Sequence, residues 1–211
     1  MTMAREKGAD TAVIDFNGSL RPTANRLGVQ YLQTEKEISD YWRGLLADIK
    51  TRNAIRKEAI AEELDESEIF ERMCQEEAHY LFIDDLNEFV NLIYHPQEPE
   101  NDMQGFLENI TEKGRLMRIY LFAGLNQDKA GELAGYGVFE NMVHEGKGIH
   151  LGGNVASQRL MDFDYVPFTE QAKAAKPGTG QLPAIDGEVT VRCVVLPLDK
   201  KNGKKETEEF A

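Results

Sequence analysis

The sequence has little of several residue types, and each shortage excludes a class of protein. Its two cysteines, Cys74 and Cys193, lack the paired spacing of a metal site, so we exclude a disulfide scaffold and predict two buried free thiols. The four histidines form no HxxxH or HxH group, so no zinc site is expected. No apolar run approaches the roughly 20 residues of a transmembrane helix, and the first residues form no signal peptide. A soluble chain is therefore expected.

Basic residues are also scarce. The 24 lysines and arginines face 37 acidic residues, which gives a net charge of −13. Such a chain offers no general surface for phosphates, so nucleic acid is not expected as a direct partner. The length of 211 residues suits one α/β domain, or one domain with a tail.

One stretch organises the chain: four apolar residues, 80–83 (YLFI), followed by Asp84 and Asp85. An unbroken apolar run of this length predicts a strand that is buried on both faces of a helix-covered sheet. Ligands bind at the carboxyl edge of such sheets, where one carboxylate can hold Mg²⁺ and its neighbour can orient or deprotonate a water. This is the Walker B pattern of P-loop NTPases. Alternatively, Asp84 or Asp85 simply caps the helix that begins near Leu86.

Two further strands end in polar residues. Residues 11–16 predict a strand that ends near Asp15, and residues 116–123 predict another that runs into Gly124 and Asn126. Parallel strands present their carboxyl ends together, so we expect Asp15, Asp84 and Asn126 along one edge of the sheet. Asp15 would then approach a nucleotide, or cap its own turn. Asn126 would sense a phosphate, or belong to an ordinary turn.

Helices are predicted between these strands. Thr34 and Glu37 have the spacing of a capping box, and the apolar residues that follow recur every three or four positions: Ile38, Tyr41, Trp42, Leu45, Leu46 and Ile49. A charged helical run continues to residue 77 with a break at residues 65–67. Further helices are expected over residues 87–94, 103–113, 127–133 and 138–143, and a helix end over residues 1–8.

Residues 28–32, near the start of the chain, predict a short strand. The last third of the chain is less regular. Residues 148–151 predict another short strand that leads into Gly152 and Gly153, and these glycines form either a tight turn or an anion cradle at the start of a helix over residues 155–160. Residues 176–180 have the composition of a turn, and residues 188–196 alternate as a final strand. We expect a disordered tail over residues 198–211.

In this order, the segments 79–85 (HYLFIDD), 118–124 (RIYLFAG), 148–154 (GIHLGGN) and 176–180 (KPGTG) resemble the FtsK/SpoIIIE-type P-loop ATPases. The resemblance is strongest to the C-terminal ATPase-like domain of EssC-type motors of type VII secretion. It covers residues 1–197. It implies a three-layer, RecA-like P-loop NTPase fold with a mainly parallel sheet that lacks the P-loop strand and helix.

The resemblance also implies roles for individual residues. By position, Asp84 matches the Mg²⁺-associated Walker B acid and Asp85 the catalytic acid, which is commonly Glu in active members. Asp15 and Asn126 would contact the nucleotide. The implied cofactor is Mg-ATP in a complete domain, and none for this chain alone. Implied partners are other domains or subunits of the motor and small helical WXG-type secreted proteins. The resemblance also implies that the domain lies on the cytoplasmic side of a bacterial membrane, to which the parent protein attaches it.

The sequence departs from this family in one respect: Gly-x4-Gly-Lys-Ser/Thr occurs nowhere. Without that loop, no row of backbone N–H groups and no lysine gathers the phosphates. Three hypotheses follow: a degenerate ATPase-like domain used in recognition or regulation, part of an active ATPase whose P-loop lies upstream of Met1, and a non-enzymatic acidic adaptor. The adaptor hypothesis would gain if the strand ending at Asp84 lay at an edge of the sheet.

Overall fold

The computed structural model describes residues 1, 4, 8–144, 146, 148–161, 163, 167–169, 171, 179–183 and 191–195. The chain divides into two compact units, Met1–Met142 and Val143–Ala211. The predicted helix end at residues 1–8 lies mostly outside the described residues, and the predicted tail lies wholly outside them. The predicted single domain over residues 1–197 stays a prediction.

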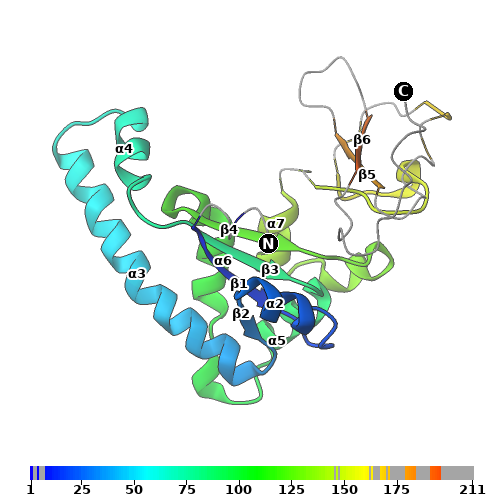
Figure 1. Ribbon diagram of the computed structural model, residues 1–211, viewed down its shortest axis with the longest axis horizontal. Coiled ribbons are helices and arrows are strands. Elements are labelled where there is room, and N and C mark those ends of the chain that lie inside the picture. The colour runs from blue at the N-terminus through cyan, green and yellow to red at the C-terminus, as the bar shows by residue number, and fades with distance from the viewer. Residues whose placement is uncertain are drawn as a thin grey trace. The chain divides into compact units, whose positions relative to one another are not determined.

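The first unit is built on a parallel sheet of four strands in the order β2-β1-β3-β4 (Figure 1). These strands are β1 (Asp10–Ile14), β2 (Gln30–Leu32), β3 (His79–Ile83) and β4 (Ile119–Ala123). Ile14 is in register with Ile83, and Ile83 with Ala123, so three strands end at the same level. The predicted mainly parallel sheet is therefore confirmed.

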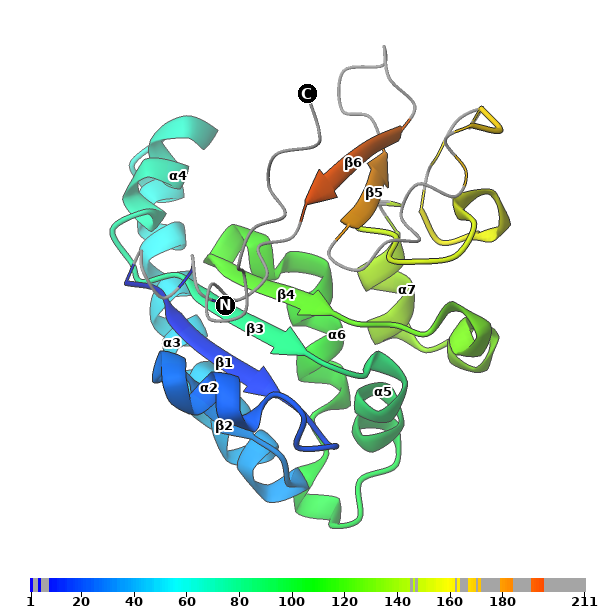
Figure 2. The same cartoon turned by 45° about the vertical axis from the view of Figure 1, so that its right-hand side comes forward.

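Helices cover the two faces of this sheet (Figure 2). On one face lie α3 (Glu35–Ala61), α5 (Leu86–Tyr94) and α6 (Gln104–Lys113), whose aromatic side chains meet around Trp42. On the other face α2 (Arg21–Leu27) packs on β1 through Ala24 and Val13. The result is the three-layer α/β arrangement that the sequence predicts. The remaining helical elements are α4 (Glu66–Met73), α7 (Gly137–Val143), and the 3₁₀ turns η1 (Pro99–Asn101), η2 (Gly114–Met117) and η3 (Gln127–Leu133).

The long helix α3 forms for the reasons that its sequence predicts. The Thr34 hydroxyl accepts a hydrogen bond from the Glu37 N–H, and the Glu37 carboxylate accepts one from the Thr34 N–H, which completes the capping box. The predicted apolar stripe faces the sheet, with Ile38, Trp42, Leu45 and Ile49 buried. The predicted break is also confirmed, because Asp65 caps α4 with a second capping box.

Helix α2 is not predicted by apolar spacing. Its signals are Pro22 in the first turn and Gly28 after the last residue, where φ is 62°. Gly28 adopts the left-handed conformation that closes the helix and directs the chain into β2.

The prediction that β3 is buried on both faces is wrong for one face. Leu81 and Ile83 are buried, but Tyr80 and Phe82 are only partly covered. On that face the rings of Tyr80 and Phe82 stack on Phe122 of β4, at centroid distances of 6.0 and 5.1 Å. Phe122 remains 49% exposed. The aromatic rings cover one another, and α2 extends over the β1 side of this face.

Strand β4 is shorter than predicted. Residues 114–117 form the turn η2, and Arg118 follows with φ of 57°, so the strand begins at Ile119. Gly114 packs closely against the first residue of the strand, since an added Cβ would lie 3.1 Å from the Ile119 carbonyl oxygen. The predicted helix over residues 127–133 is the 3₁₀ turn η3.

The second unit contains an antiparallel pair, β5 (Thr179–Pro183) and β6 (Val191–Val195). The final strand is confirmed, whereas β5 includes residues for which the sequence predicted a turn. The predicted strand at residues 148–151 is a single bridge between His150 and Gln181, and the predicted helix after Gly153 is the three-residue turn η4 (Val155–Ser157). A helix this short gives no support to the anion cradle.

Two sequence statements concern single features. The prediction of a buried thiol is wrong for Cys74, which is exposed at the C-cap of α4; the side chain of Cys193 lies outside the described residues. Among the described residues, no helix combines the length and the apolar character needed to cross a membrane.

Candidate functional site

The carboxyl edge of the sheet gathers the residues that the sequence singled out. Asp15 follows β1, Asp84 follows β3, and Gly124 follows β4, with Asn126 two residues farther on. The prediction that Asp15, Asp84 and Asn126 share one edge is therefore confirmed. β3 lies inside the sheet, between β1 and β4.

Asp85 caps α5. Its Oδ1 accepts hydrogen bonds from the N–H groups of Asn87, at 2.9 Å, and Glu88, at 3.2 Å. These bonds satisfy two of the free donors at the start of the helix. The capping alternative that the sequence left open is thus observed for Asp85, and it fixes the position of one of its carboxylate oxygens.

Asp15 is fully buried and organises the loop after β1. Its Oδ1 accepts from the N–H groups of Asn17 and Gly18, and its Oδ2 accepts from the Leu20 N–H at 2.7 Å and the Tyr31 hydroxyl at 3.2 Å. Both carboxylate oxygens are therefore used in holding the loop, as in the turn-capping alternative.

Asp84 has a different environment from its neighbours. Burial, together with the nearby charges of Asp15 and Asp85, raises the pKa of the Asp84 carboxyl, while a hydrogen bond donated by the Ser19 hydroxyl lowers it. Neither a lysine nor an arginine is among the groups that act on this pKa. Burial and two acidic neighbours thus disfavour the charged form of Asp84, and a bound cation would favour it.

Gly124 brings the end of β4 close to Asp84. A Cβ at residue 124 would lie 2.5 Å from the Asp84 carbonyl oxygen, so no other residue fits without moving the backbone. The Leu86 N–H donates to the Gly124 carbonyl at 2.8 Å, and the Gly124 N–H donates to the Ile83 carbonyl at 2.8 Å. These bonds tie the two strand ends together around the acidic pair.

Asn126 caps η3 by accepting a hydrogen bond from the Asp128 N–H at 3.1 Å. The neighbouring Asn87 on α5 donates through Nδ2 to the Lys129 carbonyl at 3.2 Å, while its buried Oδ1 has no hydrogen-bond partner among the described residues. The Asn87 amide therefore holds α5 against η3. Sequence reasoning missed Asn87, because an asparagine in a helical turn carries no distinctive signal.

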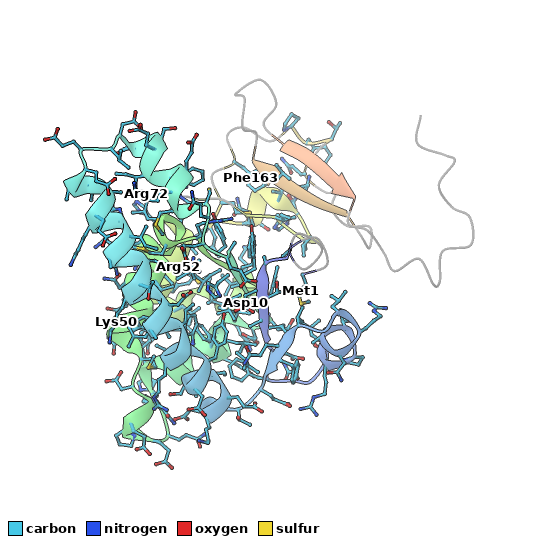
Figure 3. The ribbon with its side chains drawn as sticks, turned by 60° about the vertical axis from the view of Figure 1, so that its left-hand side comes forward. Met1, Asp10, Lys50, Arg52, Arg72 and Phe163 are labelled. Atoms are coloured by element: carbon cyan, nitrogen blue, oxygen red, sulfur yellow. The ribbon has the colours of Figure 1, made fainter. Side chains whose placement is uncertain are left out.

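The opposite edge of the sheet holds a charged cluster that sequence reasoning also missed. His79, at the start of β3, lies 2.9 Å from Asp10 Oδ2 through Nδ1 and 2.6 Å from Asp48 Oδ2 through Nε2. Arg52, on α3, contacts the same Asp48 oxygen at 2.8 Å and donates to the carbonyls of Glu77 and Met117. Figure 3 labels Arg52 on α3 and Asp10 at the start of β1.

This arrangement favours the charged form of His79. A neutral imidazole has one N–H, so it can donate to one carboxylate, whereas the imidazolium donates to both. Burial lowers the pKa of His79, but the hydrogen bonds to Asp10 and Asp48 outweigh it, so the pKa is raised from its ordinary value. The cluster lies beside a groove of about 580 Å³ between β2 and α3, whose lining includes Tyr41.

Comparisons with known proteins agree with this fold. No family model matches the sequence, and no curated protein matches it. Among solved structures, the cytoplasmic domain of EssC aligns with a TM-score of 0.68 and 15% identity over 90% of this chain and 33% of that one. EssC (ATPases 2 and 3) from Geobacillus thermodenitrificans aligns with a TM-score of 0.61 and 14% identity, over 90% and 31% of the two chains.

Two further solved structures align with this chain. The cytoplasmic domain of the Thermomonospora curvata type VII secretion ATPase EccC gives a TM-score of 0.58 and 16% identity over 91% of this chain and 20% of that one. The pCW3 conjugation coupling protein TcpA, solved in a monomer form with ATPgS, gives 0.57 and 13% over 84% and 50%. The predicted resemblance is confirmed at the level of the fold. The chain spans about a third of the length of the EssC chains that it matches.

Proposed function

We propose that this chain is an ATPase-like domain of a type VII, EssC-like protein secretion motor, in which the nucleotide site is degenerate or truncated. Its role would be to recognise secreted substrates or to regulate the motor. The observation that carries the proposal is the combination of a fold shared with EssC over 90% of the chain and a Walker B-like acidic pair at the end of an interior strand, without a P-loop sequence.

The residues present fit one part of an ATP site. Asp84 has two acidic neighbours, Asp15 and Asp85, which suits a place next to Mg²⁺, and Asp85 would be the acid in the catalytic position. Mg²⁺ would supply charge neutralisation on the phosphates when bound. Asp85 is one methylene shorter than the common Glu, and its Oδ1 accepts the hydrogen bonds that cap α5. Both features limit its reach toward a water. Asp15 and Asn126 would line the nucleotide side of the same edge.

The phosphates would find few partners in this chain. In P-loop enzymes the backbone of the loop and its lysine make most phosphate contacts. A chain of net charge −13 adds little attraction for ATP, which is itself an anion. Recognition or regulation, in which the fold serves as a binding module, therefore accounts for the sequence better than autonomous hydrolysis.

The proposed partners follow from this role. They are other domains or subunits of the motor and small helical WXG-type secreted proteins. No nucleic acid partner is proposed, because the acidic surface repels phosphates. The domain would work on the cytoplasmic side of a bacterial membrane, to which the parent protein would attach it.

A second candidate is part of an active ATPase that is completed by an upstream P-loop. The place of Asp84 at a strand end beside two other acids, which raise its pKa, favours this candidate, because such a group of carboxylates is suited to a bound cation. The acidic adaptor hypothesis loses its specific support, since β3 lies inside the sheet.

Calorimetry with Mg-ATP tests the proposal. We expect this chain to bind Mg-ATP weakly, with a dissociation constant in the millimolar range or above. This corresponds to a binding free energy of about −4 kcal/mol or weaker. Micromolar binding that is lost in Asp84→Ala, and kept in the control Glu100→Ala on the exposed turn η1, would overturn the degenerate reading and favour catalysis. A version extended at its N-terminus that binds Mg-ATP tightly would support the second candidate.

Binding to secreted proteins tests the recognition role separately. The chain is mixed with WXG-type proteins encoded beside its gene, and binding is followed by calorimetry and light scattering at low and high salt. Salt-sensitive binding is expected, given the acidic surface. A monomeric chain that binds none of them would count against recognition of substrates.

A further inference from the structure

The helices α3 and α4 form a hairpin that extends past the sheet (Figure 1). A helix of 27 residues is about 40 Å long, whereas a five-residue strand spans about 17 Å. From Ile38 to Arg52, α3 buries a regular stripe against the rest of the unit; beyond Arg52 its one buried residue is Ala59. The last third of α3 therefore packs against α4 and not against the sheet.

The base of this hairpin is held firmly. Arg52 donates to the Glu77 carbonyl, and Arg118 donates to the carbonyls of Cys74 and Glu76, so two guanidinium groups bind the segment that joins α4 to β3. The Arg72 guanidinium pairs with Glu62 at 2.6 Å and joins the two helices near their connection; Figure 3 labels Arg72 there. The hairpin is thus fixed before any partner arrives, which lowers the entropic cost of binding.

The hairpin tip, residues 58–71, has an unusual surface. It contains seven acidic residues and no lysine or arginine. Within it, Ile60 is 52% exposed and Phe70 is 57% exposed, although both are large and apolar. Single exposed apolar residues are common, but an exposed Phe on a rigid element is a frequent anchor of protein interfaces. Two such residues within a block of one charge sign indicate a surface that another protein covers.

We propose that the hairpin tip is a docking surface for a basic amphipathic helix of another protein. Two packed helices leave an open side, and a third helix laid across them would bury Ile60 and Phe70 by ordinary helix packing. Lysines or arginines flanking its apolar stripe would meet exposed carboxylates of the tip, such as those of Glu63 and Glu71.

Charge selects this occupant over the alternatives. A second copy of the chain carries the same net charge of −13, so its approach is opposed by repulsion. Nucleic acids and anionic lipid surfaces are repelled for the same reason. A neutral helix could bury the two apolar residues, but it would offer no charge to the acidic side chains around them. The inference does not rest on the proposed secretion role, because it uses the hairpin alone.

A set of three designed peptides tests the surface. The probe is an 18-residue helical peptide with leucine along one stripe and lysine elsewhere; the matched peptides carry glutamate in place of lysine, or the same leucines and lysines in scrambled order. Binding is measured by calorimetry at 50 and 300 mM salt. An environment-sensitive dye on the exposed Cys74, in a Cys193→Ser background, reports whether the peptide lies at the hairpin.

We expect the amphipathic lysine peptide to bind and to change the dye signal, and the other two peptides to bind at least tenfold more weakly. Phe70→Ser should weaken the binding about tenfold, and Glu63→Lys with Glu71→Lys should do the same. The matched control, Glu98→Lys with Glu100→Lys, reverses two exposed charges elsewhere and should change the affinity less than twofold. Circular dichroism establishes that each variant is folded.

Three results would overturn the proposal. The first is equal binding of the scrambled peptide, which would mean general attraction of a cation to an acidic protein. The second is an equal loss of affinity in the control variant. The third is the absence of binding by the amphipathic peptide at 50 mM salt to a folded chain.

Discussion

The two edges of the parallel sheet treat their carboxylates differently. At the amino edge, Asp48 has Arg52 and His79 within hydrogen-bond distance, and Asp10 has His79. At the carboxyl edge, Asp15 and Asp85 accept hydrogen bonds mainly from backbone N–H groups, and Asp84 has two acidic neighbours and no basic one acting on its pKa. The amino edge therefore pairs its carboxylates with basic side chains, whereas the carboxyl edge uses two of its carboxylates to hold a loop and a helix end.

The largest expected effect concerns the amino edge. Arg52→Met would leave the carbonyls of Glu77 and Met117 without their donor and Asp48 without its paired charge. Because Arg52 is 1% exposed, we expect the free energy of unfolding to fall by about 3–5 kcal/mol in urea denaturation. Arg43→Met, on the solvent side of α3, is the control, with an expected change below about 1 kcal/mol. Similar losses in both variants would contradict the assigned role of Arg52.

The next effect belongs to the carboxyl edge. Asp15→Ala removes the acceptor for three backbone N–H groups, so we expect a loss of about 2–3 kcal/mol in the same assay. Asp15→Asn keeps one acceptor oxygen and should lose less. An unchanged unfolding free energy in Asp15→Ala would show that this carboxylate is not structural. It would favour the alternative that Asp15 contacts the nucleotide.

His79 should make stability depend on pH. Its pKa is raised in the folded protein, so its contribution is fully present below its ordinary value of 6.5 and is lost as pH rises through the folded value. His79→Gln should therefore cost about 1–2 kcal/mol at pH 6 and less at pH 9, measured by urea denaturation at both values. A cost that grows with pH would refute the charged form of His79.

The smallest effect has the opposite sign. The pKa of Asp84 is raised, so its ionised form disfavours the folded state, and Asp84→Asn should increase the unfolding free energy at pH 7, by less than about 1 kcal/mol. The matched change at the next position, Asp85→Ala, removes a helix cap and should destabilise by about 1 kcal/mol. Thermal melts at pH 7 compare the two. If Asp84→Asn destabilised as much as Asp85→Ala, the contrast between these acids would be lost.

The sequence predicts the carboxyl edge better than the amino edge, for a physical reason. An apolar run that ends in acids marks both a strand and its end. The position of Asp84 at the end of β3, at the same level as Asp15 after β1, therefore follows from local pattern and parallel topology. His79 has no local signal, since its partner Asp10 is 69 residues away and Asp48 is 31 residues away. Contacts over such distances depend on strand order, which spacing does not encode.

Local patterns also failed to predict the burial of β3, because packing decides which side chains are covered. The run 80–83 is apolar throughout and predicts equal burial, but the cover on each face depends on which helices reach it. On the face of Phe82 the aromatic rings of β3 and β4 stack on one another, so the residues are apolar without being fully buried.

The single tryptophan gives this protein an intrinsic optical probe. Trp42 is fully buried between α3, α5 and α6, with its ring 6.4 Å from Phe89 and 6.0 Å from Phe106. Its indole N–H has no hydrogen-bond partner among the described residues, and the buried ring is packed against other aromatic rings, so its environment is apolar. Its fluorescence should therefore be emitted at short wavelength and shift to the red when water reaches the layer beneath α3. Without any label, that colour change would follow the separation of the long helix from the sheet in real time.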